Sequence, residues 1–400
     1  MPSIRQLFLS HVAKTNEMPL MLEIDRAEGI YIYDSKGKKY FDMNSGISVS
    51  SLGHCHPAVV KAVKDQVSRH MHTMVYGEHI QSPQASYASL LTSQLHKRLD
   101  LVYFVMTGTE TVELAMKLAR KQTGRTEIIA CRNAYHGSTY GAEALRSDTG
   151  FTMHFAPGVP GVRHINYNLV EDLNKITKST AAVIVEPVQA ESGVHPPLDN
   201  YLLQLKIRCE KVGALFILDE IQTGFGRTGA LFAHQKYNAI PDVLLIAKSM
   251  GGGMPIGAVV SSEKIFSSMI KNPALGHITT FGGHPVSCAA AHATLTTILE
   301  NELPEKVLTK EALIRRTLQH PIIKEIRSSG LMMAVELTKR KYLKHVVGKC
   351  MDLGLIIDWF LFNDRSFRLA PPLIITEQEI DEACKIILEA MDYAFEKYNH

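Results

Sequence analysis

Short apolar runs alternate with amphipathic segments through the middle of the chain. Residues 101–106, 127–131, 182–186, 215–219, 243–247 and 256–260 are predicted strands. Residues 111–122 form a predicted helix, because Val112, Ala115, Met116 and Ala119 recur at i, i+3, i+4 and i+7. A second helix is predicted at 201–212. Continuous apolar strands indicate a sheet covered on both faces, so we expect a doubly wound α/β core with a mostly parallel sheet.

The two ends of the chain have a different pattern. Residues 30–34 and 39–42 flank Ser35-Lys36-Gly37-Lys38, which predicts a β-hairpin. Residues 331–337 and 367–369 are further predicted strands. Thr376 and Glu379 have the spacing of a capping box that begins a helix to about residue 398. We therefore expect a small α+β domain built from residues 1–52 and 301–400, around a large α/β domain of residues 53–300.

Composition and charge exclude several classes of protein. Of 400 residues, 46% are hydrophobic and 21% charged, which is typical of a globular chain rather than a disordered one. The net charge of +3 favours neither nucleic acid nor an anionic membrane. No apolar run approaches the ~18 residues of a membrane span. The six cysteines are widely spread without a Cys-x-x-Cys pair, so we expect reduced thiols in a cytoplasmic protein.

Two predicted strands end in charged residues that are rarely buried. Asp219 and Glu220 follow the apolar run 215–218, at the strand end where α/β sheets bind ligands. Lys248 follows the apolar run 244–247, where desolvation would lower its pKa and make its amine nucleophilic. The alternatives are a helix cap or internal salt bridge for the acids, and a lysine reaching past a sheet edge to solvent.

A third feature is Thr107-Gly108-Thr109-Glu110, which joins a predicted strand to a predicted helix. Gly108 would let an anion approach the backbone, and the first helical N–H groups could bind a phosphate. The alternative is an ordinary strand–helix turn.

Other motifs are weaker. Residues 224–229 match G-x-G-x-x-G, but the acidic pair just before them would repel the pyrophosphate of a dinucleotide. Gly251-Gly252-Gly253 follows Lys248, whereas a P-loop places its lysine after the glycines. His54-Cys55-His56 has no second Cys/His cluster to complete a zinc site, so we expect no metal.

In combination, these motifs resemble the class III aminotransferases over nearly the whole chain. The resemblance runs through Gly53-His54-Cys55-His56-Pro57, Ala134-Tyr135-His136-Gly137 and Val185-Glu186-Pro187, and is strongest from Leu218 to Gly229. It continues through Lys248, Thr279-Thr280-Phe281-Gly282-Gly283 and Arg368-Leu369-Ala370-Pro371-Pro372. It implies a pyridoxal 5'-phosphate (PLP) enzyme of the aspartate-aminotransferase-like fold, fold type I, similar to acetylornithine and 4-aminobutyrate aminotransferases.

The resemblance also implies roles for individual residues. Lys248 would hold the cofactor aldehyde as a Schiff base and then shuttle a proton, and Asp219 would keep the pyridine nitrogen protonated. The other implied roles are ring stacking by Tyr135, phosphate binding by Gly108 and Thr109, and a contact of Gln222 with the ring hydroxyl. His136 is given no chemistry.

Three residues concern the partner subunit and the substrates. Thr280 would bind the phosphate of the neighbouring subunit's cofactor, which implies a homodimer with shared active sites; its alternative is a capping hydroxyl. Arg368 would bind the α-carboxylate of glutamate or 2-oxoglutarate. Glu191 would pair with Arg368 when the substrate lacks that carboxylate.

The sequence departs from the family pattern at positions that the resemblance links to substrate specificity. Ser138 occupies a position where several ω-aminotransferases have arginine, and Arg146 is a candidate substitute. Ala190 and Ser192 replace the usual glycines around Glu191, and His284 replaces an asparagine. We therefore expect an ω-amino donor (acetylornithine-, 4-aminobutyrate- or diamine-like) and 2-oxoglutarate as acceptor. The alternatives are an aminomutase, a racemase, a decarboxylating or pyruvate-dependent transaminase, a non-catalytic PLP-binding protein, or a nicotinamide dehydrogenase based on residues 224–229 alone.

Overall fold

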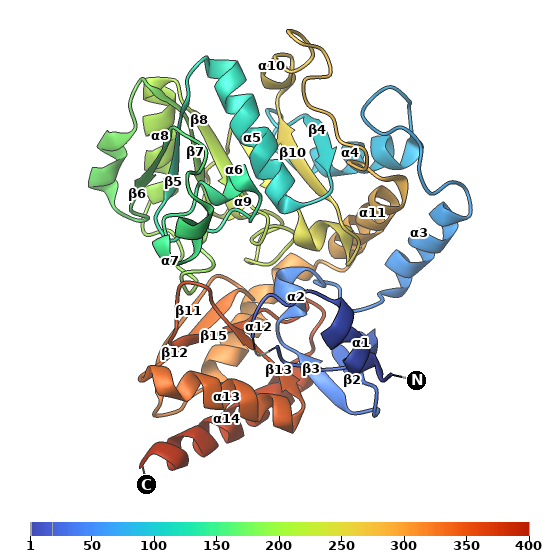
Figure 1. Ribbon diagram of the computed structural model, residues 1–400, viewed down its shortest axis with the longest axis vertical. Helices are drawn as coiled ribbons and strands as arrows, with labels where there is room; N and C mark the ends of the chain where they lie inside the picture. The colour runs from blue at the N-terminus through green and yellow to red at the C-terminus, as the bar shows by residue number, and fades with distance from the viewer. Residues whose placement is uncertain (1, 18, 400) are drawn as a thin grey trace.

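A seven-stranded sheet forms the centre of the molecule in a computed structural model that describes residues 2–17 and 19–399 (Figure 1). The strand order is β4-β10-β9-β8-β7-β5-β6. The strands are β4 (Leu101–Val105), β5 (Glu127–Cys131), β6 (Val162–Ile165), β7 (Thr180–Val185), β8 (Leu215–Asp219), β9 (Val243–Ile246) and β10 (Gly257–Ser261). β10 runs antiparallel to both neighbours and the other pairs are parallel, so the predicted mostly parallel sheet is confirmed.

Both faces of this sheet are buried, as the continuous apolar strands predicted. Consecutive residues of one strand join different cores: Phe216 and Leu244 belong to one apolar cluster, and Ile217 and Leu245 to the other. Helix α5 (Gly108–Thr123) packs against β7, β9 and β10, and α8 (Tyr201–Val212) packs against β7 and β8.

The two ends of the chain meet in the lower half of Figure 1. One sheet has the order β1-β2-β3-β13 and another the order β11-β12-β15-β14. β13 (Leu355–Ile356) pairs in parallel with β3 (Lys39–Asp42), so a C-terminal strand completes the N-terminal sheet. The other strands are β1 (Ile24–Glu28), β2 (Tyr31–Asp34), β11 (Ile323–Ser328), β12 (Met333–Leu337), β14 (Asp358–Trp359) and β15 (Ser366–Leu369). The domain boundaries themselves stay a prediction.

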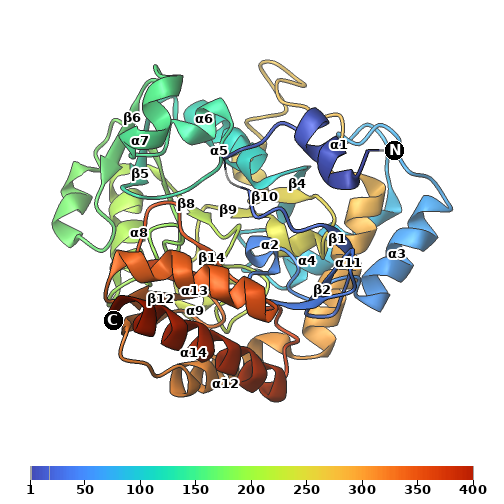
Figure 2. The same cartoon turned by 60° about the horizontal axis from the view of Figure 1, so that its bottom comes forward.

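Three C-terminal helices pack beside these sheets: α12 (Leu303–Thr317), α13 (Arg340–Leu353) and α14 (Glu377–Asn399), and α14 contacts the other two (Figure 2). The Thr376 hydroxyl accepts from the Glu379 backbone N–H, and the Glu379 carboxylate accepts from the Thr376 N–H, which is the predicted capping box. The remaining helices are α1 (Ile4–His11), α2 (Ser45–Ser48), α3 (Pro57–Val67), α4 (Ser82–Ser93), α6 (Tyr140–Glu143), α7 (Thr149–Thr152), α9 (Ala233–Lys236), α10 (Glu263–Phe266) and α11 (Pro285–Glu300), with 3-10 turns η1 (Met153–Phe155), η2 (Val170–Lys175) and η3 (Lys248–Gly251).

The glycine-rich segment 224–229 connects the large sheet to the two ends of the chain through hydrogen bonds in the interior. Its Arg227 is fully buried and donates hydrogen bonds to the carbonyls of Leu331 and Pro371 and to the Ser51 hydroxyl. Burial lowers the pKa of Arg227 to about 9. The segment thus ties the end of β8 to both chain ends.

The thiols of the chain are unpaired. All six cysteines are free; Cys55 is exposed and the other five are buried. Within residues 2–17 and 19–399, no three His, Cys, Asp or Glu side chains gather as a metal site would require. None of the helices described is both long and apolar enough to cross a membrane.

Candidate active site

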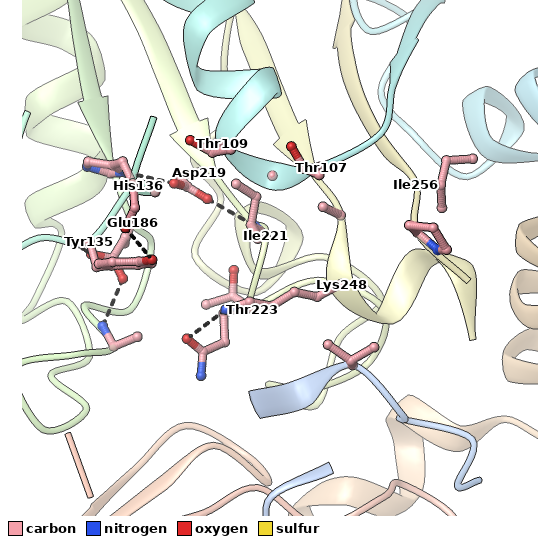
Figure 3. Close-up of a pocket in the computed structure, with 18 of the residues that line it drawn as sticks. Thr107, Thr109, Tyr135, His136, Glu186, Asp219, Ile221, Thr223, Lys248 and Ile256 are labelled. Carbon is pink, nitrogen blue, oxygen red and sulfur yellow. Dashed lines mark hydrogen bonds and ion pairs between the residues drawn. The ribbon is translucent and has the colours of Figure 1, made fainter. Parts of the chain in front are cut away.

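A cavity of about 680 Å³ lies at the carboxyl ends of the central strands. Figure 3 shows Asp219, Tyr135 and Lys248 converging on it from three different parts of the chain, with Thr109 at the start of α5. Seven of the nine site residues predicted from the sequence and resemblance line this cavity directly: Gly108, Thr109, Tyr135, Glu191, Asp219, Gln222 and Lys248. Arg368 lies behind Glu191, and Thr280 lies elsewhere.

Lys248 is the first residue of η3, directly after β9 and Ala247. Its φ of 45° lies in the left-handed region, which turns the chain sharply at the end of the strand. Its Nζ lies 3.4 Å from the Gln222 Oε1. Burial lowers the pKa of Lys248, although the carboxylates of Glu191 and Asp219 act in the opposite direction. A larger fraction of this amine is therefore neutral than in an exposed lysine.

Asp219 ends β8 and forms a buried pair with His136. The His136 Nδ1 lies 2.6 Å from one Asp219 oxygen, and the Ile221 backbone N–H donates to the other at 3.0 Å (Figure 3). Burial by itself lowers the pKa of His136, but the hydrogen bond and charge of Asp219 outweigh it, so the pKa is raised. The sequence alone indicated no chemistry for His136, whereas the structure makes it the partner that orients Asp219.

Glu186 is a second site residue that was not predicted from the sequence. It follows β7, and its two oxygens accept hydrogen bonds from the backbone N–H groups of Tyr135 (3.1 Å) and Ala190 (2.9 Å). Burial raises the pKa of Glu186 to about 7. Glu186 thus joins the turn that carries Tyr135 to the loop that carries Glu191. In the sequence it was an acidic residue at the end of an apolar strand, within the Val185-Glu186-Pro187 motif of the resemblance, but neither signal assigned it a role.

The first turn of α5 forms one end of the cavity. Thr107 and Glu110 make a capping box, which leaves the N–H groups of Gly108 and Thr109 in the first turn without intrahelical acceptors. The Thr109 hydroxyl contacts the Thr139 hydroxyl at 2.7 Å. A Cβ at Gly137, whose φ is 125°, would lie only 2.3 Å from the Thr109 Oγ1. Glycine at this position therefore allows the Tyr-His-Gly turn to approach the helix terminus.

Arg368 lies on β15 and is covered by Glu191. Its Nη2 lies 2.9 Å from each Glu191 oxygen, and the Leu361 backbone N–H donates to Glu191 as well. Asp358, the cross-strand neighbour of Arg368, lies 3.4 Å from its Nε. The Arg368 Nη1 is buried and has no hydrogen-bond partner among the residues described, so the guanidinium keeps a donor for a further carboxylate.

Two predicted residues do not take part in this cavity. Thr280 is exposed and does not line this chain's own cavity. Arg146, the candidate substitute for an arginine at position 138, is already paired: its Nε and Nη2 donate to Asp148 and its Nη1 donates to Glu143. Both carboxylates lie within three residues of Arg146 in the sequence.

Comparison with known proteins identifies the family. The "Aminotransferase class-III" family model matches residues 12–391. An acetylornithine aminotransferase of Methanopyrus kandleri is 41% identical over 369 residues, which cover 91% of this chain and 92% of that protein. A putrescine aminotransferase of Pectobacterium atrosepticum is 36% identical over 379 residues, covering 90% of this chain and 80% of that protein.

Solved structures agree with the sequence comparisons. The ornithine aminotransferase of Toxoplasma gondii, in which PLP partially occupies the active site, has a TM-score of 0.91 and 31% identity, covering 99% of this chain and 96% of that one. The acetylornithine aminotransferase of Elizabethkingia anophelis has a TM-score of 0.84 and 32% identity, covering 97% and 98%. The chain belongs to the class III aminotransferases, which are PLP-dependent transferases, and the predicted fold is confirmed.

Proposed function

We propose that this enzyme moves an amino group from an ω-amino donor to an α-keto acid, with 2-oxoglutarate as the acceptor. The observation that carries the proposal is the placement of the Lys248 amine, the Asp219 carboxylate and the first turn of α5 around one cavity. A keto acid is a suitable acceptor because the buried Arg368 Nη1 has no hydrogen-bond partner among the described residues and is a donor for the acceptor's α-carboxylate.

The residues present fit PLP. The N–H groups of Gly108 and Thr109 are suited to its phosphate, and Asp219 to its pyridinium nitrogen. Tyr135 would stack on the ring, Gln222 would contact the ring hydroxyl, and Lys248 would hold the aldehyde carbon. When bound, PLP withdraws electrons from the substrate carbon that loses a proton.

The remaining steps fall to side chains of this chain. The lowered pKa of Lys248 makes its amine able to accept a proton from the substrate carbon and to release it again. The His136 Nδ1–H fixes the orientation of Asp219, and Glu186 fixes the backbone of Tyr135. Glu191 neutralises Arg368 while a donor without an α-carboxylate is bound, and moves aside when a keto acid arrives.

A panel of amine donors against 2-oxoglutarate and pyruvate, with detection of both products, tests this proposal. We expect 2-oxoglutarate to be converted to glutamate in equal amounts with the carbonyl product. Exclusive use of pyruvate would overturn the choice of acceptor. Product formation from the amine without any acceptor would instead show a mutase or racemase.

The role proposed for Arg368 is tested by Arg368→Ala. Loss of hydrogen bonds to a charged group costs about 1.5–3 kcal/mol, so the KM for the keto acid should rise roughly 10- to 100-fold. The KM for an amine without an α-carboxylate should change little, because Arg368 is then paired with Glu191. Steady-state kinetics with each substrate varied separately measures both constants. Equal increases in the two KM values would contradict the role.

We also propose a homodimer with shared sites, in which Thr280 serves the cavity of the partner. The exposure of Thr280 supports this, as does the exposed apolar surface of the segments around it and after α3, formed by Met71, Met74, Ile80, Ile270, Leu275, Ile278 and Phe281. We expect the wild-type protein to sediment as a dimer. The Ile80→Glu variant should dissociate into monomers and retain PLP less well. Ile207→Glu, on the exposed side of α8, is the matched control. A fully active wild-type monomer would contradict the proposal.

A further inference from the structure

Lys248 is held in a backbone conformation that lysine rarely adopts. Its φ of 45° lies in the left-handed region, where the Cβ of any residue other than glycine is crowded by the backbone. Such a conformation persists only where the surrounding structure holds it. The contacts that fix this turn therefore determine the point from which the Lys248 side chain reaches into the cavity.

A second strained turn, α2, borders the same cavity. All four of its residues have positive φ: Ser45 at 54°, Gly46 at 59°, Ile47 at 61° and Ser48 at 62°. Only one of the four is a glycine, and Ile47 is β-branched, the kind of residue for which this conformation is least favourable. Val49, the next residue, lines the cavity.

The left-handed turn is fixed by hydrogen bonds on both of its sides. The Asn44 Oδ1 accepts from the Ile47 backbone N–H at 3.1 Å. The Asp42 Oδ1 accepts from the Ser45 backbone N–H at 2.8 Å. The Ser45 hydroxyl in turn donates to the carbonyl of Ala370, the residue after β15, at 2.7 Å. The turn is thus anchored well enough to support a second strained segment.

Ser249 joins the two strained turns through its hydroxyl. It follows Lys248 in the chain, is buried, and donates from its Oγ to the Ser48 carbonyl at 2.6 Å. The Ser51 Oγ lies 2.6 Å from the Ser249 Oγ. Because Ser249 gives its only hydroxyl proton to the carbonyl, the proton between the two hydroxyls belongs to Ser51.

The chain of hydrogen bonds begins at the buried Arg227. Its Nη2 donates to the Ser51 Oγ at 2.9 Å, and its Nη1 donates to two backbone carbonyls of the C-terminal part of the chain. Every donor points the same way, from Arg227 through Ser51 and Ser249 to the Ser48 carbonyl. Each hydroxyl therefore gives one hydrogen bond and receives one. In a buried site, hydrogen bonds in such a chain strengthen one another.

We propose that Ser249 is a positioning residue for Lys248. Its hydroxyl fixes the strained turn of Lys248 to the left-handed turn of α2, so that the lysine backbone stays in place while its side chain leaves the cofactor and returns. Ser249 does not itself line the cavity, so it acts through its neighbour. The inference rests on the proposed function, in which Lys248 holds the PLP aldehyde and moves a proton.

Ser249→Ala tests the proposal in the PLP-loaded full-length enzyme. Rapid mixing with an amine donor, and separately with a keto acid, follows the absorbance of the bound cofactor in each half of the reaction. Because Lys248 acts in both halves, we expect both limiting rates to fall by the same factor, roughly tenfold, through the lost hydrogen bond and the displaced amine. The substrate concentrations that give half-maximal rates should not change.

Attachment of PLP gives a readout that needs no substrate. The apoprotein is mixed with PLP, and the fraction attached to Lys248 is trapped with borohydride at successive times. Ser249→Ala should slow this attachment, again roughly tenfold. Ser249→Cys has a weaker donor at the same place, so its attachment rate should lie between those of Ser249→Ala and the wild type.

Ser261→Ala is the matched control. Ser261 is also buried and donates to a backbone carbonyl, that of Asp242, at 2.7 Å. It pairs with Val243, at the opposite end of β9 from Lys248. Ser261→Ala and Ser249→Ala should lose similar thermal stability in melting curves, whereas Ser261→Ala should keep the wild-type rates.

The outcomes distinguish a positioning role from a purely structural one. If Ser249→Ala and Ser261→Ala have the same rates of PLP attachment and turnover, Ser249 only supports the fold and the inference is wrong. A loss confined to one half of the reaction, or confined to the substrate concentrations for half-maximal rate, would also overturn it. Absence of any response of the wild-type cofactor to amines would contradict the proposed function instead, and the attachment rates would still decide the inference.

Discussion

Lys248→Ala is expected to abolish transamination while the protein remains folded. The amine of Lys248 is the only lysine amine among the described residues that line the cavity, and its pKa is lowered by burial so that it can accept a proton. General acid–base catalysis alone contributes 10²- to 10⁴-fold, and the lysine is also proposed to hold the cofactor. We therefore expect kcat to fall at least roughly 10⁴-fold, measured by glutamate formation from 2-oxoglutarate.

The control for this prediction is Lys264→Ala, which removes an exposed lysine of α10. It should leave both kcat and the melting temperature unchanged. The Lys248→Ala protein should also keep a wild-type melting profile in the absence of PLP, because Lys248 makes only one long side-chain hydrogen bond within the described part of the chain, to Gln222. Turnover near the wild-type rate in Lys248→Ala would remove the proposed mechanism entirely.

The elements that hold this site were predictable because their local patterns are strong. β8 and β9 occur within the predicted runs that end at Asp219 and Ala247, since uninterrupted apolar residues indicate a strand covered on both faces. Helix α5 begins at Gly108, three residues before the predicted start at residue 111. The apolar periodicity does not reach the first turn, where the capping box determines the helix terminus instead.

The direction of the strands and the contacts between residues far apart in the sequence were harder to predict from the sequence. Nothing in the apolar run at 257–261 shows that β10 lies antiparallel to β4 and β9, because a buried strand has the same pattern in either direction. Glu186 accepts a hydrogen bond from the backbone N–H of Tyr135, 51 residues away. Because every residue except proline has a backbone N–H, the sequence does not show which one Glu186 binds.

Arg146 shows a different limit of prediction from sequence, because its charge is paired with residues close to it in the sequence. Glu143 and Asp148 are near enough in the sequence to suggest that this arginine is already paired. Whether a charge is available to a substrate depends on its pairing, which composition does not reveal. Ser138 could be recognised as a departure from the family pattern, but its consequence depends on the engagement of Arg146 and the covering of Arg368.

Asp219→Asn should reduce kcat/KM by roughly 10³-fold or more, because a preorganised charge in a buried site contributes strongly to catalysis. In the proposed mechanism the Asp219 carboxylate stabilises a proton on the pyridine nitrogen, and an amide of the same shape lacks that charge. The substitution also removes the interaction that raises the pKa of His136, so that this buried histidine should lose its proton more readily.

Asp242→Asn provides the comparison needed to separate chemistry from folding. Asp242 is also a largely buried aspartate, and it accepts a hydrogen bond from the Phe216 N–H of the same strand as Asp219, but it does not line the cavity. Both variants should lose some thermal stability, whereas only Asp219→Asn should lose turnover. Parallel kinetics, melting curves and PLP content of the two proteins distinguish these effects. If the two variants lose activity equally, Asp219 acts through the fold rather than through the pyridine nitrogen. If Asp219→Asn stays near the wild-type rate, catalysis does not need the Asp219 carboxylate and the proposed role is wrong.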